Sequence, residues 1–336
     1  MDTDFPALVF GIYPGGFSPT ETMPPDDPGR IQAALAALQP DPGYPLLVRC
    51  YLAYDDGMSV ARMEAEADPK DFTRYLTAGR RLDLVVSYQS ETGDIDGYQN
   101  VVRELVRRFG PVLSTLQITE EPNVGSTDLV DDDITDLVDG KVPHVREALV
   151  AGVLAGKAEA LRSGWTEVQV GFNVAPSFDG DTFFAELGEI GGTAWSRALD
   201  YVGLDCFPDV WMHPVDADGR PGDLRDAMVE LLRWLRGEMA SAGIPPTTPI
   251  HITEHGWPTG TDRTAARQAA VIEHCVRSVH EHRAEFNVRA YELWSLRDGN
   301  SRGTDLFDQF GIMLDDYTPK PAFTTYRNLI AELSQR

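Results

Sequence analysis

The fold of this chain is decided by residues 250–260, Ile-His-Ile-Thr-Glu-His-Gly-Trp-Pro-Thr-Gly. An apolar, β-branched run ends in the carboxylate of Glu254, and the turn formers Gly256, Pro258 and Gly260 follow at once. Alternating strand residues before a breaker-rich turn place Glu254 at the C-terminal end of a β-strand. The stretch therefore predicts a strand that presents a carboxylate at its tip.

A second stretch, residues 116–123, has the same design, with the sequence Leu-Gln-Ile-Thr-Glu-Glu-Pro-Asn. Glu120 and Glu121 follow its apolar residues, and Pro122 interrupts the strand pattern. The C-terminal ends of parallel strands meet at one mouth of a barrel, which is where such enzymes place their active sites. Carboxylates at two strand ends therefore indicate acid/base or nucleophilic chemistry.

Outward from these two stretches, the chain alternates between strand and helix patterns. The predicted strands are residues 8–13, 45–51, 82–88, 112–119, 167–173, 200–206, 250–254 and 287–294. The predicted helices are residues 29–38, 58–79, 97–109, 142–163, 181–199 with a break at Gly191-Gly192, 223–242, 264–283 and 320–333. Eight βα units are the number that closes a parallel barrel, and no G-x-G-x-x-G fingerprint of a doubly wound sheet follows any strand. We therefore predict an α/β fold, a (β/α)8 TIM barrel, as a single domain over residues 1–336.

The composition argues against several classes of function. With 42% hydrophobic residues a buried core is expected, and a formal net charge of −24 argues against a nucleic-acid partner. The cysteines, Cys50, Cys206 and Cys275, are too scattered for a disulfide framework or a zinc site, so we expect no metal and no cofactor. No apolar run approaches the roughly 18 residues that span a bilayer, and the N-terminus has no signal-peptide pattern. We expect no membrane partner and, unless a leader has been removed, a cytoplasmic location.

The residues expected at the strand ends are rich in carboxylates, aromatic rings and hydrogen-bonding groups: Tyr13, Arg49, Tyr51, Tyr88, Glu120, Glu121, Asn173, Asp205, Glu254 and Trp294. Strand alternation predicts that His251, by contrast, faces the helix layer. At this point the chain resembles clan A of the glycoside hydrolases, the retaining (β/α)8 enzymes with carboxylates after strands four and seven. Glu121-Pro122-Asn123 is similar to the acid/base signature of that clan. Residues 253–258 resemble its nucleophile signature as found in family 17 β-1,3-glucanases.

The resemblance implies a retaining glycoside hydrolase that cleaves a β-linked glycoside by double displacement. Glu121 would be the acid/base, Glu254 would be the nucleophile, and Arg49 would help to keep Glu254 ionised. The partner would be a carbohydrate, a β-glycoside or an oligosaccharide. The residues expected to bind it are Arg49, Tyr88, Glu120, Asn173, Trp257 and Trp294, with tryptophan faces against the sugar rings.

Two positions depart from the pattern of the clan. The clan usually has Asn before the acid/base, where it binds the sugar 2-hydroxyl, and this chain has Glu120. The clan often has a Tyr after strand six that contacts the nucleophile, and this chain has Phe207, so Tyr201, Tyr291 or another group would have to supply that hydroxyl. The alternative function is accordingly a catalytically inactive TIM-barrel pseudoenzyme that binds a carbohydrate or a protein. A metal-dependent hydrolase that uses the scattered histidines is a third hypothesis.

Overall fold

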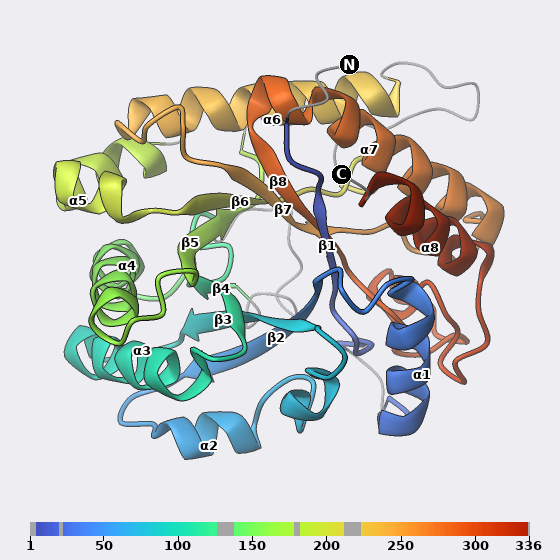
Figure 1. The fold of residues 1–336 in the computed structure, drawn as a ribbon, viewed down its shortest axis with the longest axis horizontal. Coiled ribbons are helices and arrows are strands. Elements are labelled where there is room, and N and C mark those ends of the chain that lie inside the picture. Colours follow the sequence, from blue (N-terminus) through green and yellow to red (C-terminus); the bar gives the residue numbers. More distant parts are fainter. Residues whose placement is uncertain (1–4, 20–22, 126–137, 178–181, 212–222, 335–336) are drawn as a thin grey trace.

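The computed structural model describes residues 5–19, 23–125, 138–177, 182–211 and 223–334, and its strands close into a parallel barrel inside a ring of helices (Figure 1). The strands follow one another round the barrel in chain order, and the first pairs with the last. They are β1 (Val9–Ile12), β2 (Leu46–Tyr54), β3 (Arg81–Tyr88), β4 (Leu113–Ile118), β5 (Gln169–Val174), β6 (Tyr201–Asp205), β7 (Ile250–His255) and β8 (Val288–Leu293). The predicted (β/α)8 TIM barrel is confirmed.

Each strand is followed by a helix that packs on the outside of the barrel (Figure 1). The helices are α1 (Pro28–Leu38), α2 (Val60–Ala65), α3 (Ile95–Phe109), α4 (Val145–Arg162), α5 (Phe183–Ala198), α6 (Leu224–Ser241), α7 (Ala265–Phe286) and α8 (Pro321–Leu333). The predicted break in α5 is present, because Gly192 has φ 56° and ψ −159° inside the helix. Such angles suit glycine, which carries no Cβ.

The helix predicted over residues 58–79 is wrong in its extent. The structure has the short helix α2 and, further on, a 3-10 turn at Phe72–Tyr75. Between them the backbone of Asp68 exchanges hydrogen bonds with Tyr51 on β2, at 2.8 and 3.0 Å. Pro69 follows and disfavours helical geometry at the residue before it, so pairing with the strand replaces helix there.

The main apolar core lies between the strands and the helices. Alternate strand residues such as Ile250 and Ile252 point into this layer and are fully buried. His251 lies between them and therefore faces the barrel interior, where its ring stacks on Tyr201 at a centroid distance of 4.3 Å. The prediction that His251 faces the helix layer is wrong, because the two isoleucines occupy the helix-facing positions of this strand.

The barrel interior is polar, and glycines make room for its large side chains. A Cβ on Gly11 would lie 2.5 Å from Oε2 of Glu292, and one on Gly203 would lie 2.5 Å from Oγ1 of Thr253. Both distances are too short for a side chain, so these positions require glycine. The space that the two glycines leave is filled by acidic and hydroxyl groups inside the barrel.

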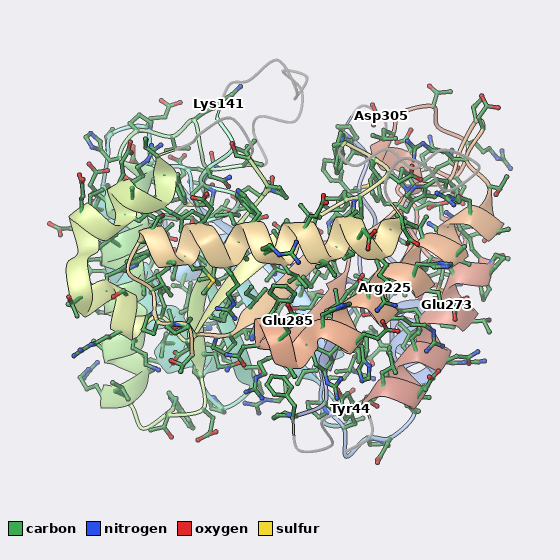
Figure 2. The ribbon with its side chains drawn as sticks, turned by 90° about the horizontal axis from the view of Figure 1, so that it is seen from above. Tyr44, Lys141, Arg225, Glu273, Glu285 and Asp305 are labelled. Carbon is green, nitrogen blue, oxygen red and sulfur yellow. The ribbon has the colours of Figure 1, made fainter. Side chains whose placement is uncertain are left out.

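The two ends of the barrel carry different loops. Figure 2 shows Lys141 and Asp305, which lie in the loops after β4 and β8, on one side of the molecule, and Tyr44, which precedes β2, on the opposite side. The first side is the C-terminal end of the strands. Among the helices of the described residues, none is long and apolar enough to cross a membrane.

Candidate active site

The turn after β4 has an unusual backbone. Thr119 has φ 68° and Glu121 has φ 39°, so both residues that flank Glu120 are in the left-handed region. A β-branched residue such as Thr119 is rarely found there, and backbone strain of this kind costs about 1–3 kcal/mol and clusters at functional sites. The strained turn marks the end of β4 as a candidate functional position.

Asp139 holds this turn in place. Its Oδ2 accepts hydrogen bonds from the backbone N–H groups of Tyr88 and Glu120, both at 2.8 Å, and its Oδ1 accepts one from Nε2 of Gln89 at 2.7 Å. The backbone of Asp139 also donates to the carbonyl of Glu120 at 2.8 Å. Asp139 thereby ties the turn that carries the glutamates to the end of β3.

Arg49, on β2, is the buried cation beneath the site. Its guanidinium lies 2.7 Å from Asp83, 3.4 Å from Glu254 and 3.5 Å from Glu120. It also donates a hydrogen bond to Oε1 of Gln117 at 2.9 Å. Because Arg49 is only 1% exposed, its contacts are with these protein side chains, and it positions the carboxyl groups.

Glu254 is held by groups from β2. The Tyr51 hydroxyl donates a hydrogen bond to Oε1 of Glu254, and the same hydroxyl accepts one from Nε of Arg49 at 2.8 Å. Neither Tyr201 nor Tyr291 donates a hydrogen bond to Glu254. The Tyr291 hydroxyl bonds to Nδ1 of His255, and the Tyr201 ring stacks on His251 below the site. The hydroxyl that Phe207 lacks is supplied from the other side of the barrel.

Asn173, on β5, connects three carboxyl-bearing residues. Its Nδ2 donates hydrogen bonds to Glu120 at 2.9 Å and to Asp205, and its Oδ1 accepts one from the backbone N–H of Glu121 at 2.9 Å. A register shift between β6 and β7 pairs Asp205 with Glu254. One oxygen each of Glu120, Asp205 and Glu254 therefore lies within 4.8 Å of the others.

Glu121 and Glu254 have different surroundings. Burial and the nearby Glu254 raise the pKa of Glu121 to about 8, and in the described residues no side chain donates a hydrogen bond to the Glu121 carboxyl. Burial also raises the pKa of Glu254, but the Arg49 guanidinium and the Tyr51 hydroxyl oppose that rise. Two carboxyl groups whose environments differ in this way suit an acid and an ionised partner.

An aromatic cluster borders the carboxyl groups. We call Tyr13, Phe207, Trp294 and Phe310 the aromatic wall, since they pack together apart from the main core. Tyr51 joins the wall to Glu254, because its ring contacts Tyr13 at a centroid distance of 5.3 Å. Trp211 extends the wall outward, because it is 42% exposed and stacks on Phe310 at 5.8 Å. Such faces can pack against a sugar ring.

The predicted site residues fall into three groups. Glu120, Glu121, Glu254 and Trp294 lie at the C-terminal mouth of the barrel. Arg49 and Asn173 lie beneath them, at 1% and 0% exposure, and fix their positions.

Tyr88 and Trp257 lie away from the carboxyl groups. The Tyr88 ring packs on Tyr98 of α3 at 5.0 Å, and Nε1 of Trp257 donates a hydrogen bond to Asp209 at 3.1 Å. Both rings belong to the main core, and their expected part in substrate binding stays a prediction.

Tyr51 and Asp205 were expected at strand ends without a catalytic or binding role, and Gln117 was not expected in the site. Tyr51, Asp205 and Gln117 each contact a residue of the candidate site. The signal for Tyr51 was its spacing, because it stands two residues after Arg49 and so shares the same strand face. Gln117 lies on β4, and nothing in its own pattern distinguished it from an ordinary strand residue.

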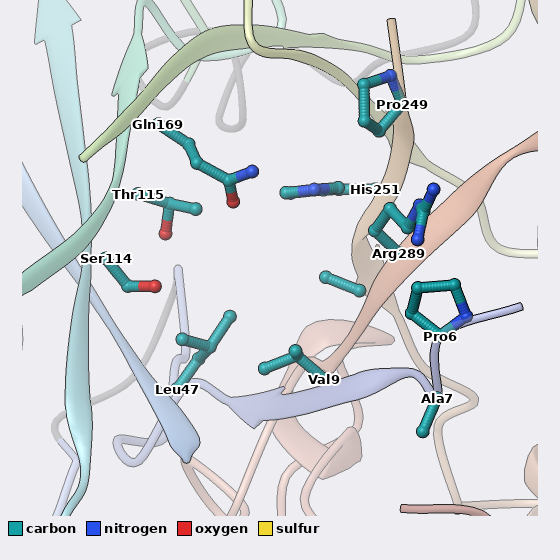
Figure 3. Close-up of a pocket in the computed structure, with 11 residues that line it drawn as sticks. Pro6, Ala7, Val9, Leu47, Ser114, Thr115, Gln169, Pro249, His251 and Arg289 are labelled. Atoms are coloured by element: carbon teal, nitrogen blue, oxygen red, sulfur yellow. The ribbon is translucent and has the colours of Figure 1, made fainter. Parts of the chain in front are cut away.

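A separate cavity of about 300 Å³ lies at the opposite end of the barrel (Figure 3). It is lined by strand starts and the N-terminal segment, namely Pro6, Ala7, Val9, Leu47, Ser114, Thr115, Gln169, Pro249, His251, Arg289 and Ala290. Its lining holds no carboxylate. The chemistry therefore belongs to the other end, where the glutamates lie.

Fold and site together define a class of protein: a (β/α)8 barrel with carboxyl groups at the C-terminal ends of β4 and β7. No protein-family model matches the chain, and no curated protein sequence matches it.

Solved structures do match. The β-glucosidase from Thermotoga maritima in complex with noeuromycin has a TM-score of 0.63 and 12% identity, covering 100% of this chain and 99% of its own. The apo structure of a β-glucosidase 1317 has a TM-score of 0.60 and 18% identity, covering 91% and 88%. A family 39 glycoside hydrolase from the gut symbiont Bacteroides cellulosilyticus WH2 has a TM-score of 0.60 and 14% identity, covering 100% and 65%. These likenesses show a shared fold.

Proposed function

We propose that the chain is a retaining glycoside hydrolase that cleaves a β-linked glycoside by double displacement. The observation that carries the proposal is the contrast between Glu121 and Glu254 at one barrel mouth. Glu121 has a pKa raised to about 8 by burial and the nearby Glu254, whereas Glu254 receives the Tyr51 hydroxyl and the Arg49 guanidinium. The fold that the chain shares with β-glucosidases is consistent with this chemistry.

The mechanism needs one protonated and one ionised carboxyl group. An oxygen of Glu254 attacks the anomeric carbon, the bond from that carbon to the glycosidic oxygen breaks, and the leaving oxygen takes the proton of Glu121. In the second step, water attacks the same carbon and gives a proton to Glu121, and the ester bond to Glu254 breaks. Tyr51 and Arg49 stabilise the Glu254 carboxylate before attack and after release.

The test is covalent trapping of the nucleophile. A panel of 2-deoxy-2-fluoro glycosyl inactivators that carry good leaving groups should label Glu254, which peptide mass spectrometry identifies. Glu254→Ala should abolish turnover of aryl β-glycosides. Full activity in that variant, or labelling at another residue, would show the assignment to be wrong.

The alternative, an inactive barrel that binds a carbohydrate or a protein, drew support from Glu120 and Phe207. Tyr51 supplies the hydroxyl that Phe207 lacks, so only Glu120 still favours the inactive barrel.

The variant Glu121→Gln separates the two functions. In a hydrolase this change should lower kcat about 10²–10⁴-fold on substrates with poor leaving groups. It should also remove an alkaline limb of the pH profile near 8, since the acid must be protonated. Binding without turnover in the unchanged protein would favour the alternative.

A further inference from the structure

We propose that Glu120 makes this site selective for glycosides whose C2 carries a protonated amino group, that is, for β-linked 2-amino-2-deoxyglycosides. The inference rests on the proposed function, because it names the substrate class of that same site.

The site holds more acidic groups than cations. Arg49 forms ion pairs with Asp83, Glu120 and Glu254, and no other Lys or Arg pairs with these three within the described ranges. Asp205 adds a further carboxyl group next to Glu254. Since one guanidinium faces several carboxyl groups, a cationic ligand would reduce the excess negative charge.

Of Glu120 and Asp205, which both lie beside Glu254, Glu120 is the more exposed. Asp205 is 1% exposed and accepts hydrogen bonds from Thr253, at 2.6 Å, and Asn173. Glu120 is 6% exposed, and its carboxyl group lies within 4.8 Å of an oxygen of Glu254. Glu120 is therefore the residue that would touch the ligand.

The position of Glu120 selects the C2 substituent. Glu254 attacks the anomeric carbon, and the nearest donor-bearing group of the sugar ring is the substituent on the adjacent carbon, C2. Hydrogen bonds to that substituent strengthen in the transition state of glycoside hydrolysis. Because Glu121 serves the leaving oxygen on the other side of the anomeric carbon, Glu120 is free for the C2 substituent.

The neighbours of Glu120 favour a charged partner over a hydroxyl. Gln117 and Asn173 donate hydrogen bonds to its two oxygens, at 2.7 and 2.9 Å, and thereby fix its orientation. A hydroxyl group would donate one hydrogen bond to this carboxylate. An ammonium group donates a hydrogen bond and also brings a positive charge, so the two groups form an ion pair at a site where little water screens it.

Protonation gives a second readout. Burial and the nearby Glu254 raise the pKa of Glu120 well above its usual range, so Glu120 holds a proton more often than an ordinary glutamate does. An ammonium group would displace that proton, whereas a neutral sugar would not. Binding of the amino sugar should therefore release a proton to the buffer.

The experiment compares three aryl β-glycosides on the unchanged protein: the glucoside, the 2-amino-2-deoxyglucoside and its N-acetyl form. We expect kcat/KM for the amino sugar to exceed both others by about 10–100-fold at a pH where its amine is protonated. Glu120→Gln should abolish this preference. Glu167→Gln, which removes an exposed carboxylate before β5, should preserve it. If Glu120→Gln does not fold, loss of the preference as pH rises through the pKa of the amine tests the same charge.

Each outcome decides between the two proposals. If neutral glucosides are cleaved as fast or faster, with Glu254 labelled, the amino-sugar inference is overturned and the proposed function stands. If no glycoside is cleaved, the proposed function fails, and calorimetry of glucosamine against glucose in two buffers decides the inference. Tighter binding of glucosamine with proton release, lost in Glu120→Gln, supports it. Equal binding, or none, overturns it.

Discussion

At the scale of single residues, the Tyr51 hydroxyl has the most direct contact with the candidate nucleophile. It donates to Glu254 and accepts from Arg49, so it joins the carboxylate to the buried cation. A hydrogen bond donated to the ionised form of a carboxyl group lowers its pKa. Tyr51 therefore serves as a positioning residue that also helps to keep Glu254 ionised.

Tyr51→Phe tests this role. Loss of the hydroxyl should lower kcat about 10-fold or more, and the acidic limb of the pH profile should move to higher pH because the pKa of Glu254 rises. The measurement is kcat/KM against pH on an aryl glycoside. Tyr201→Phe is the matched control, because it removes a buried hydroxyl that has no partner in the described structure. An unchanged acidic limb in Tyr51→Phe would contradict the role.

At the scale of elements, the side chain of Asp139 ties the turn directly after β4 to the end of β3. Asp139 accepts from the backbone N–H groups of Tyr88 and Glu120 and so joins the ends of β3 and β4. Thr119 and Glu121 keep their left-handed backbone only where such contacts over-determine it. The position of both glutamates therefore depends on Asp139.

Asp139→Ala should lower the free energy of unfolding by about 2–4 kcal/mol, because it leaves two buried N–H groups without acceptors. It should also reduce kcat, since the turn that carries Glu121 loses its anchor. Denaturant unfolding and steady-state kinetics measure the two effects. Asp139→Asn keeps an acceptor oxygen and should cost less. Equal stability of Asp139→Ala and the unchanged protein would contradict this account.

At the scale of the whole molecule, buried titratable groups set the dependence of stability on pH. Burial raises the pKa of Glu121 and of Asp139 to about 8, so the folded state binds more protons than the unfolded state between their ordinary values and pH 8. The contribution of these two carboxyl groups to the free energy of unfolding is full at low pH and is lost as pH rises through about 8. Burial lowers the pKa of His251 and of His255 to about 3, so their contribution is lost as pH falls below about 6.5.

The melting temperature should therefore fall between pH 7.5 and 8.5, where the histidines are almost fully neutral in both states and the buried carboxyl groups still respond. Thermal unfolding followed by circular dichroism over this range measures it. Asp139→Asn should flatten the slope, because it removes one of the two groups. A melting temperature that rises over the same range would contradict the assignment of these pKa shifts.

The sequence by itself determined the barrel and the two strand tips that carry Glu121 and Glu254. Both follow from local patterns: strand alternation, turn formers and the regular return of helices. The extent of α2 was not predictable in this way. Asp68 forms backbone hydrogen bonds with Tyr51 in place of helical ones, and this contact joins a loop to a strand that lies earlier in the chain.

Only the tertiary structure decided which side chains meet. Tyr51 reaches Glu254 from the far side of the barrel, and Tyr88, also near a strand end, packs instead on a helix. The register shift that pairs Asp205 with Glu254 likewise could not be predicted from the sequence. The physical reason is that alternation assigns a residue to a strand face, whereas the stagger and closure of the strands decide its neighbours across the barrel.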